Sequence, residues 1–279
     1  ILTVTFTEKA AAEMRQRIEA GLGPGAVTAP GASLYIHTFH GLCARILRDH
    51  CYEAGLPPDH GVLDELQSNE RRERLLHRLL GGELQSVDEL SLERLLDLGL
   101  RNLNAIGDAI GSAVAKAKSH GWSPEEFRTR MLDSCQSFWS ALPAPDAAPA
   151  PEDVFDAIRE SLPSKWLGDA GRSAEDKGND IRKAYYGTVK SATVTEGLAE
   201  RWGRQAESER IAIRLCAAAY EVYQDELEAQ GLLDFDDQIL RTVRLLSGSE
   251  EVRREYQTRF EYVLVDEFQD TSPVQMELI

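Results

Sequence analysis

The feature that most constrains the fold is an alternation of strand and helix patterns at both ends of the chain. Ile1–Phe6 is rich in β-branched residues, and a helical pattern begins directly after Thr7. Ser33–His37 is a second strand pattern, and Thr38 is a suitable N-cap for the helix that follows. The apolar positions of that helix are Phe39, Leu42, Cys43, Ile46 and Leu47. Strand–helix–strand–helix order predicts a parallel α/β sheet.

The middle of the chain has a different pattern. From about residue 50 to 230 helical periodicity dominates, and the segment 143–151 is too rich in Pro and Ala to pack as a core. After Gly231 the α/β pattern returns. We therefore predict a predominantly helical α/β protein. Residues 1–50 and 231–279 form its α/β domain, and residues 51–230 form an all-helical insertion with a flexible linker near 143–151.

Charge and cysteine usage exclude several classes of protein. The net charge is −16, which argues against a surface that embraces nucleic acid everywhere. Residues 1–50 hold five Lys or Arg and four Asp or Glu, so they carry +1 and the remainder carries −17. A local basic path is therefore compatible with the composition. The four cysteines are widely and irregularly spaced, which does not indicate a zinc or iron–sulfur site.

Location and completeness are expectations from the sequence. No apolar run approaches the roughly eighteen residues that span a bilayer, and no signal-peptide pattern opens the chain, so we expect a cytoplasmic protein. The first residues have a strand pattern without an initiator Met. We therefore expect the numbering to begin inside a longer gene product.

The strongest chemical signal is a pair of acids after an apolar strand pattern. Tyr262–Val265 is a short apolar run that predicts a buried parallel strand, and Asp266 and Glu267 follow it at once. Hydrolysis of a phosphoanhydride with magnesium needs one acid to hold the water shell of the metal and another to orient and deprotonate the attacking water. Asp266 would take the first role and Glu267 the second. Two acids after a strand also occur as a solvated loop start, so both interpretations stay open.

Several motifs together resemble one family. The segment Asp266–Thr271 reads Asp-Glu-Phe-Gln-Asp-Thr, and with Thr5–Met14 and His37–Cys43 it resembles the UvrD/Rep/PcrA helicases of superfamily 1. Leu233–Asp237 and Ala54–Pro57 also match that family. The resemblance covers residues 1–65 and 210–279 well, and residues 80–208 carry little that aligns.

The resemblance implies a fold and an activity. It implies a partial RecA-like parallel sheet, called subdomain 1A, interrupted by a large helical subdomain, 1B. It also implies an ATP-dependent 3′-to-5′ DNA helicase or translocase that uses Mg²⁺ and ATP, with Glu267 as the base, Asp266 on the metal through water, and Gln269 beside Asp266 at the nucleotide. Its partners would be single-stranded DNA and junctions of single- and double-stranded DNA. Nuclease or repair proteins are possible further partners, and no membrane is expected.

The resemblance also implies where DNA would bind. Phe6 would stack on a base, with Thr7 and Lys9 nearby, and Thr38, Phe39 and His40 would line a second contact. Stacking on an aromatic ring is tolerant of sequence, which suits a protein that moves along any DNA. Phe6 and Phe39 each have the alternative of a core aromatic, and His40 that of a helix-start histidine bonded to the main chain.

Two departures from the family pattern separate the hypotheses. Many UvrD/Rep members have Asn where this chain has Glu8, and the form with Glu resembles the helicase subunits of RecBCD and AddAB helicase–nucleases. The chain also contains no Gly-x-x-x-x-Gly-Lys-Ser/Thr loop for phosphates, so we expect the polypeptide as written not to hydrolyse ATP. The alternatives are a helicase–nuclease subunit, or a DNA- or protein-docking module in which the insertion binds DNA only weakly.

Overall fold

The computed structural model describes residues 1–22, 35–80, 103–142 and 198–279. The elements before the gap at residue 81 are β1 Leu2–Thr5, α1 Glu8–Leu22, β2 Tyr35–Thr38, α2 Phe39–Asp49, β3 Gly61–Val62 and α3 Glu65–Leu80. The central helices are α5 Leu103–Ser119, α6 Pro124–Ala141 and α10 Leu198–Ala229. The last elements are β4 Leu232–Leu233, α11 Phe235–Gly248, α12 Glu250–Arg259, β5 Val263–Val265, the 3-10 turn η2 Phe268–Asp270 and α13 Pro273–Leu278.

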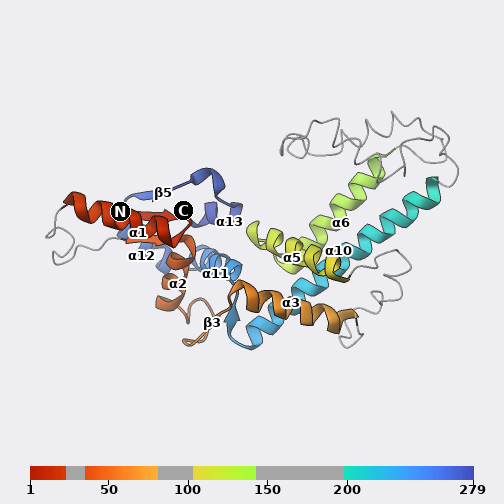
Figure 1. The fold of residues 1–279 in the computed structure, drawn as a ribbon, viewed down its shortest axis with the longest axis horizontal. Helices are drawn as coiled ribbons and strands as arrows, with labels where there is room; N and C mark the ends of the chain where they lie inside the picture. The colour runs from red at the N-terminus through yellow and green to blue at the C-terminus, as the bar shows by residue number, and fades with distance from the viewer. Residues whose placement is uncertain (23–34, 81–102, 143–197) are drawn as a thin grey trace. The chain divides into compact units, whose positions relative to one another are not determined.

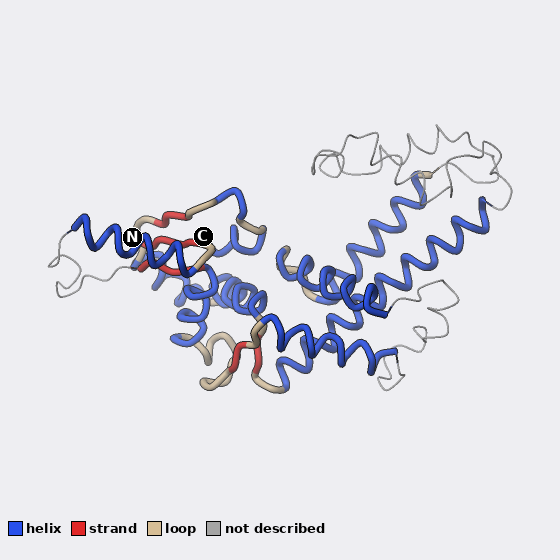
Figure 2. The backbone as a smooth tube through the Cα atoms, in the orientation of Figure 1, coloured by secondary structure: helices blue, strands red, loops and turns tan. Residues whose placement is uncertain are grey.

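The chain forms two compact units. The first contains Ile1–Arg78, Gly107–Pro124 and Ala219–Ile279, and the second contains Leu79–Ile106 and Glu125–Ala218. Residues 51–78, 107–124 and 219–230 therefore pack with the two ends of the chain, although they fall inside the segment 51–230 that the sequence assigns to the insertion. Figure 2 shows that helices dominate both units and that the strands are few and short. The α/β class with many helices is confirmed.

The main sheet has three parallel strands in the order β2-β1-β5. Leu2 pairs with Tyr35 on one side and with Val263 on the other, so strands from the two ends of the chain lie side by side. The β1 side chains are buried, and Val4 has no exposed surface. The predicted strand at the C-terminal end is confirmed, but its predicted burial is wrong. β5 pairs on one side only, and Leu264 is 56% exposed.

The core of the first unit lies between the sheet and the helices α2 and α11. All five predicted apolar positions of α2 are buried, which confirms that face of the helix. Thr38 caps α2 by accepting the Gly41 N–H, Asp234 caps α11 within a capping box, and Ser272 caps α13 in the same way. Each cap stood in the sequence as a Ser, Thr or Asp before an apolar helical pattern.

A second parallel sheet, β3 with β4, is not indicated by the sequence pattern. Gly61 donates its N–H to the carbonyl of Gly231 (3.1 Å) and begins this sheet. Gly231 has φ +62°, and a Cβ there would lie 2.7 Å from Pro57. Only glycine combines that backbone with that approach. The family-like segment Ala54–Pro57 therefore has a packing role against the turn that precedes β4.

The second unit is described only in part. In it α6 and the first half of α10 run side by side (Figure 1), and the Trp139 indole N–H donates to Glu209 (2.8 Å). Phe127 and Cys135 are the buried side chains of α6. The predicted linker at 143–151 lies outside the described residues. Among the helices that the structure describes, none has the length and apolar character needed to cross a membrane.

Candidate functional site

The three strands of the main sheet end at the same edge. β1 ends at Thr5, which pairs with Thr38 at the end of β2, and Val4 pairs with Val265 at the end of β5. The residues that follow the strands are therefore neighbours along this carboxyl edge, as in open parallel sheets that bind ligands there. All the residues that the sequence nominated as a site lie at the end of one of these three strands or shortly after it.

Asp266 and Glu267 continue β5 past its last pairing. The Asp266 N–H donates to the carbonyl of Val4 (3.0 Å), which fixes the first acid against β1. Glu267 has φ 51° and ψ 44°, and it is the one non-glycine residue with positive φ in the described part of the chain. A left-handed backbone is unfavourable for a residue with a Cβ, and such strain is concentrated at functional sites. Both side chains are exposed.

The turn after the acids is held from two sides. The side-chain amide of Gln269 donates to the Glu267 carboxylate, so Gln269 orients the second acid. Beyond the turn, Val274 is buried in the core, and the capping box of Ser272 and Gln275 starts α13. The acids therefore lie on a short turn whose start is bonded to β1 and whose end is packed against α11.

The two phenylalanines of the edge have different environments. Phe6 is partly buried, and its ring lies 5.3 Å from the ring of Phe39 at 56°. Phe39 is 1% exposed and belongs to the core, which is the alternative that the sequence left open. In this arrangement Phe39 packs against the ring of Phe6 from the core, and its own ring is not accessible to a ligand.

The polar residues of the first loop are exposed. Thr7 accepts the Ala10 N–H on its hydroxyl (3.1 Å), and its main-chain carbonyl accepts the Thr5 hydroxyl (3.1 Å). The side chain of Lys9 is 87% exposed and lies 3.9 Å from Glu13, a surface pair that is easily broken. Lys9 is therefore available as a cation at this edge.

The Thr38 hydroxyl both accepts and donates a hydrogen bond within the protein. Its hydroxyl accepts the Gly41 N–H (3.0 Å) and donates to Glu8 (2.9 Å). The sequence nominated Thr38 without indicating this partner, because Glu8 stands thirty residues away along the chain. The bond joins the start of α1 to the start of α2.

His40 lies against an aromatic ring that the sequence did not nominate. Its ring meets Phe235, the first residue of α11, edge-on at 5.4 Å, and Phe235 is 46% exposed. Burial lowers the pKa of His40 below its ordinary value. The imidazole is therefore neutral at pH 7 and can contribute hydrogen bonds or packing at this edge but no charge.

A buried ionic cluster lies in the same unit. The Lys118 ammonium, 0% exposed, contacts Asp234 (2.7 Å) and Asp237 (2.8 Å), and the Tyr223 hydroxyl also donates to Asp234 (3.1 Å). The sequence could have indicated Lys118, since it stands four residues after buried Val114 and eight after buried Ile110 on one helix face. We call Lys118, Asp234 and Asp237 the buried charge cluster.

The two acids of the buried charge cluster differ in pKa. Burial raises the pKa of Asp237 to about 6, aided by the nearby charge of Asp234 and opposed by Lys118. Burial also raises the pKa of Asp234, but the charge and hydrogen bond of Lys118 outweigh it and leave that pKa below its ordinary value. One cation cannot stabilise the ionised forms of two carboxylates equally, so the pKa values of the two acids separate. This cluster joins α5 to the cap of α11 and is inaccessible to a ligand.

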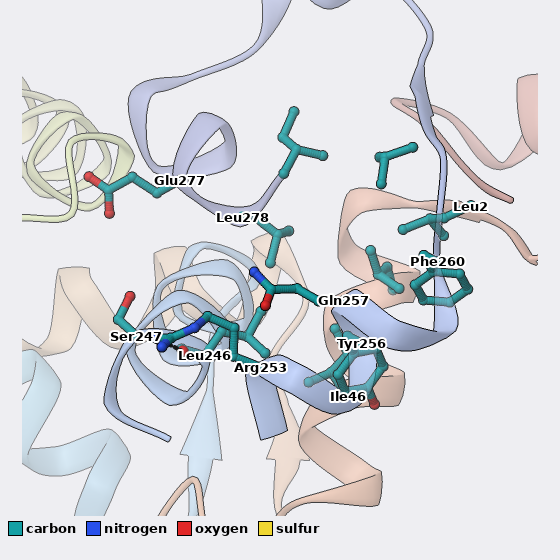
Figure 3. A pocket seen from close by; sticks show the side chains of 13 residues that line it. Leu2, Ile46, Leu246, Ser247, Arg253, Tyr256, Gln257, Phe260, Glu277 and Leu278 are labelled. Carbon is teal, nitrogen blue, oxygen red and sulfur yellow. Dashed lines mark hydrogen bonds between the residues drawn. The ribbon is translucent and has the colours of Figure 1, made fainter. Parts of the chain in front are cut away.

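A pocket of about 330 Å³ lies elsewhere in the first unit. Figure 3 shows Leu2, Ile46, Leu246, Phe260 and other mainly apolar side chains around it. Leu2 and Val263 begin their strands, so this pocket opens at the amino end of the sheet. It is therefore separate from the acids, which follow the carboxyl ends.

The donor set at the carboxyl edge fits a weakly held, hydrated divalent cation. Among the described residues, no group of three or more His, Cys, Asp or Glu side chains is arranged to enclose a metal. Mg²⁺ does not need such a cage, because it keeps several waters and uses one or two carboxylates with substrate phosphates. The exposed carboxylate of Asp266, on a backbone fixed to β1, meets that requirement.

The fold is that of an α/β protein with a parallel sheet, and its candidate site lies at the carboxyl ends of the strands, where such sheets commonly bind ligands. Comparison with known proteins gives the family. The model of the UvrD/REP helicase N-terminal domain matches residues 1–279, and the chain belongs to this family.

Curated relatives match along the whole chain. It is 27% identical over 279 residues to DNA helicase II of Haemophilus influenzae and to the ATP-dependent DNA helicase PcrA of Bacillus subtilis. These alignments cover 100% of this chain but 25% and 24% of the relatives, so the chain spans about a quarter of their length. The ATP-dependent DNA helicase Rep of Escherichia coli is 47% identical over 66 residues, which are 24% of this chain and 10% of Rep.

Proposed function

We propose that this chain supplies the hydrolytic acids and part of the DNA contact of an ATP-dependent 3′-to-5′ DNA helicase or translocase. The observation that carries the proposal is the position of Asp266 and Glu267, which follow a strand that pairs directly with the strand ending before Phe6. The acid pair and the aromatic ring of the first loop therefore share one sheet edge. A motor that couples hydrolysis to movement needs its nucleotide and DNA contacts on such a common element.

Asp266 would hold Mg²⁺ through its water shell. Bound with ATP, the metal would neutralise charge on the β- and γ-phosphates. Asp266 itself would fix the position of that water shell, because its main chain is bonded to Val4 and cannot shift independently of β1.

Glu267 would orient the attacking water and accept its proton. Glu267 has a left-handed backbone directly after β5, and Gln269 holds its carboxylate by a hydrogen bond. A general base must be placed within hydrogen-bond reach of the water, and a bonded carboxylate is more closely positioned than a free one. Gln269 would therefore act mainly as an orienting residue beside the nucleotide.

Single-stranded DNA would bind along the loops that follow β1 and β2. Phe6 would stack on a base, since its ring is partly exposed and packs on Phe39. Thr7 and Lys9 would hold phosphates, and His40 would add a neutral hydrogen-bonding group. Stacking of this kind contributes about 1–3 kcal/mol per base.

We further propose that residues 1–50 and 231–279 belong to the motor subdomain and that residues 51–230 belong to the inserted subdomain. Within that insertion, residues 107–124 pack with the motor part in the first compact unit. The buried charge cluster supports a fixed link at this point, because Lys118 of α5 bonds the cap residue of α11.

The test is DNA-stimulated ATP hydrolysis by the complete protein, with strand separation of duplexes that carry a 3′ or a 5′ single-stranded tail. We expect hydrolysis that depends on DNA, and separation of the 3′-tailed duplex alone. Separation of the 5′-tailed duplex alone would refute the polarity, and absence of DNA-dependent hydrolysis would refute the motor function.

The DNA contact has its own test. We expect Phe6→Ala to weaken oligo(dT) binding by about 5- to 100-fold, in line with the stacking of one base. Phe268→Ala is the matched control, because Phe268 is also an exposed aromatic but follows the acid pair. Equal losses from both variants would remove the specific role of Phe6.

A further inference from the structure

The bond between Glu8 and Thr38 places a carboxylate at the edge where the DNA backbone is proposed to bind. Glu8 is the first residue of α1 and is exposed, and its Oε1 accepts the Thr38 hydroxyl at 2.9 Å. In the described part of the chain no ion pair neutralises Glu8. The nearest proposed phosphate-binding cation, Lys9, is paired with Glu13 instead.

The Thr38 hydroxyl has one proton, and Glu8 holds it. A threonine hydroxyl can donate one hydrogen bond and accept two. At Thr38 the donor is committed to the carboxylate, and one acceptor position is filled by the Gly41 N–H. A bond to a carboxylate is stronger than one between neutral groups, so a phosphate must compete for this proton.

Thr7 offers the contrast within the same site. Its hydroxyl also accepts a helix N–H, that of Ala10, but no acceptor for its own proton lies among the described residues. Of the two threonines nominated as DNA contacts, Thr7 donates its proton to no described residue, whereas Thr38 donates to Glu8. Gly41 contributes to this difference, because a Cβ there would lie 3.0 Å from the Thr38 hydroxyl oxygen and 3.9 Å from the Glu8 carboxylate.

We propose that Glu8 is a positioning residue that weakens the hold of this edge on DNA by occupying the Thr38 hydroxyl and by placing a negative charge beside the phosphate path. The inference rests on the DNA contact proposed above. In this role Glu8 allows rapid release of the DNA backbone at the second contact. Its bond to Thr38 keeps α1 and α2 joined when DNA dissociates. The stacking residue Phe6 and the donor of Thr7 then supply most of the affinity of this edge.

The test is a set of oligo(dT) titrations of the complete protein, without nucleotide, at several salt concentrations. We expect Glu8→Gln to bind oligo(dT) about 3- to 10-fold more tightly at low salt, because removal of a like charge near a phosphate is favourable, and the gain should shrink as salt screens it. Glu19→Gln is the matched control, since Glu19 is an exposed acid on the same helix three turns away. An equal gain from Glu19→Gln would overturn the proposal.

A double-mutant cycle tests the occupied hydroxyl directly. Thr38→Val should weaken DNA binding at least threefold more in the Glu8→Ala background, where the hydroxyl is free, than in the wild-type background. Thr38→Ser keeps the hydroxyl and the cap, so its effect should not differ between the two backgrounds. Equal effects of Thr38→Val in the two backgrounds would overturn the proposal.

The outcomes separate this inference from the proposed function. If the wild-type protein binds oligo(dT) and Phe6→Ala weakens it while Glu8→Gln changes nothing, the DNA contact stands and the role of Glu8 is refuted. If neither the wild type nor any variant binds, the DNA contact itself is refuted and the role of Glu8 falls with it.

Discussion

Two acidic motifs of this chain look alike as sequence and differ in three dimensions. Leu233-Asp-Phe-Asp-Asp237 and Asp266-Glu-Phe-Gln-Asp270 both place acids around a phenylalanine after an apolar strand. In the first, Asp234 and Asp237 are buried around Lys118. In the second, Asp266 and Glu267 are exposed at the end of β5.

The difference follows from what comes after each strand. β4 runs straight into α11, so its acids become the N-cap and third residue of a helix and satisfy each other's main chain. β5 is followed by a left-handed residue and a 3-10 turn, which leave the carboxylates facing solvent. The buried acids share a cation, whereas no described Lys or Arg forms an ion pair with Asp266 or Glu267.

Removal of the proposed base should have the greatest consequence for activity. We expect Glu267→Gln in the complete protein to lower DNA-stimulated ATP turnover by about 100- to 10,000-fold, because general-base catalysis contributes that range. Nucleotide binding should be preserved, since Gln keeps the size of the side chain. Asp270→Asn, in the same turn, is the control and should retain most turnover. Undiminished ATP turnover by Glu267→Gln would show that the motif at Asp266–Asp270 has no catalytic role.

Lys118→Met should cause the largest loss of stability. We expect the free energy of unfolding to fall by about 3–5 kcal/mol, since two buried carboxylates lose their shared cation. Urea denaturation followed by circular dichroism measures the loss. Lys116→Met removes an exposed lysine from the same helix and should change stability by less than about 0.5 kcal/mol. A similar small change for Lys118→Met would show that the buried charge cluster does not stabilise the fold.

The pH dependence of unfolding should report Asp237. The folded pKa of Asp237 is raised to about 6 by burial, above its ordinary value of 3.8, so the folded state favours the protonated acid. Its contribution to stability is therefore full below about pH 4 and is lost as pH rises through 6, at up to about 1.4 kcal/mol per pH unit.

Asp237→Asn provides the comparison for that titration. The variant should lose most of the fall in stability between pH 4 and 6, while Asp225→Asn, which removes an exposed acid of α10, should keep it. Burial and the charge of Asp234 also raise the pKa of Asp236, so Asp236→Asn should remove a smaller part of the same fall. Asp234 has a lowered pKa, so its own contribution is lost at lower pH and does not overlap this window. An unchanged slope in Asp237→Asn, measured by urea denaturation at each pH, would assign the transition to another group.

The smallest expected effect concerns the backbone of Glu267. Glycine accepts φ 51° without strain, so Glu267→Gly should relieve about 1–2 kcal/mol. Glycine also gives up about 0.5–1 kcal/mol more chain entropy on folding. We therefore expect a net gain of about 0.5 kcal/mol in unfolding free energy together with loss of ATP turnover. A clear loss of stability would mean that the Glu267 side chain holds the fold.

The fold was largely predictable because its signals are local. Thr38, Asp234 and Ser272 were recognisable as caps, and the buried face of α2 was recognisable by its spacing. The arrangement of side chains at the candidate site was less predictable. Phe39 and Phe6 are both aromatic and close to a strand end, and only packing shows that one lies beneath the other. The exposure of β5 was not predictable either, because an apolar strand pattern does not tell how many neighbours the strand has.

The elements, their caps, the family and the two acids after a strand can be read from the amino-acid sequence, because each depends on residues a few positions apart. Which charged groups form pairs depends instead on how distant segments pack. Lys118 meets Asp234 across 116 residues, and Glu8 meets Thr38 across 30. Packing between distant segments selects such partners. Hydrophobic periodicity predicts the helices and strands, but it does not predict which of them pack together. The same kind of residue, an aspartate after an apolar strand, thus became a buried support at one strand and an exposed acid at another.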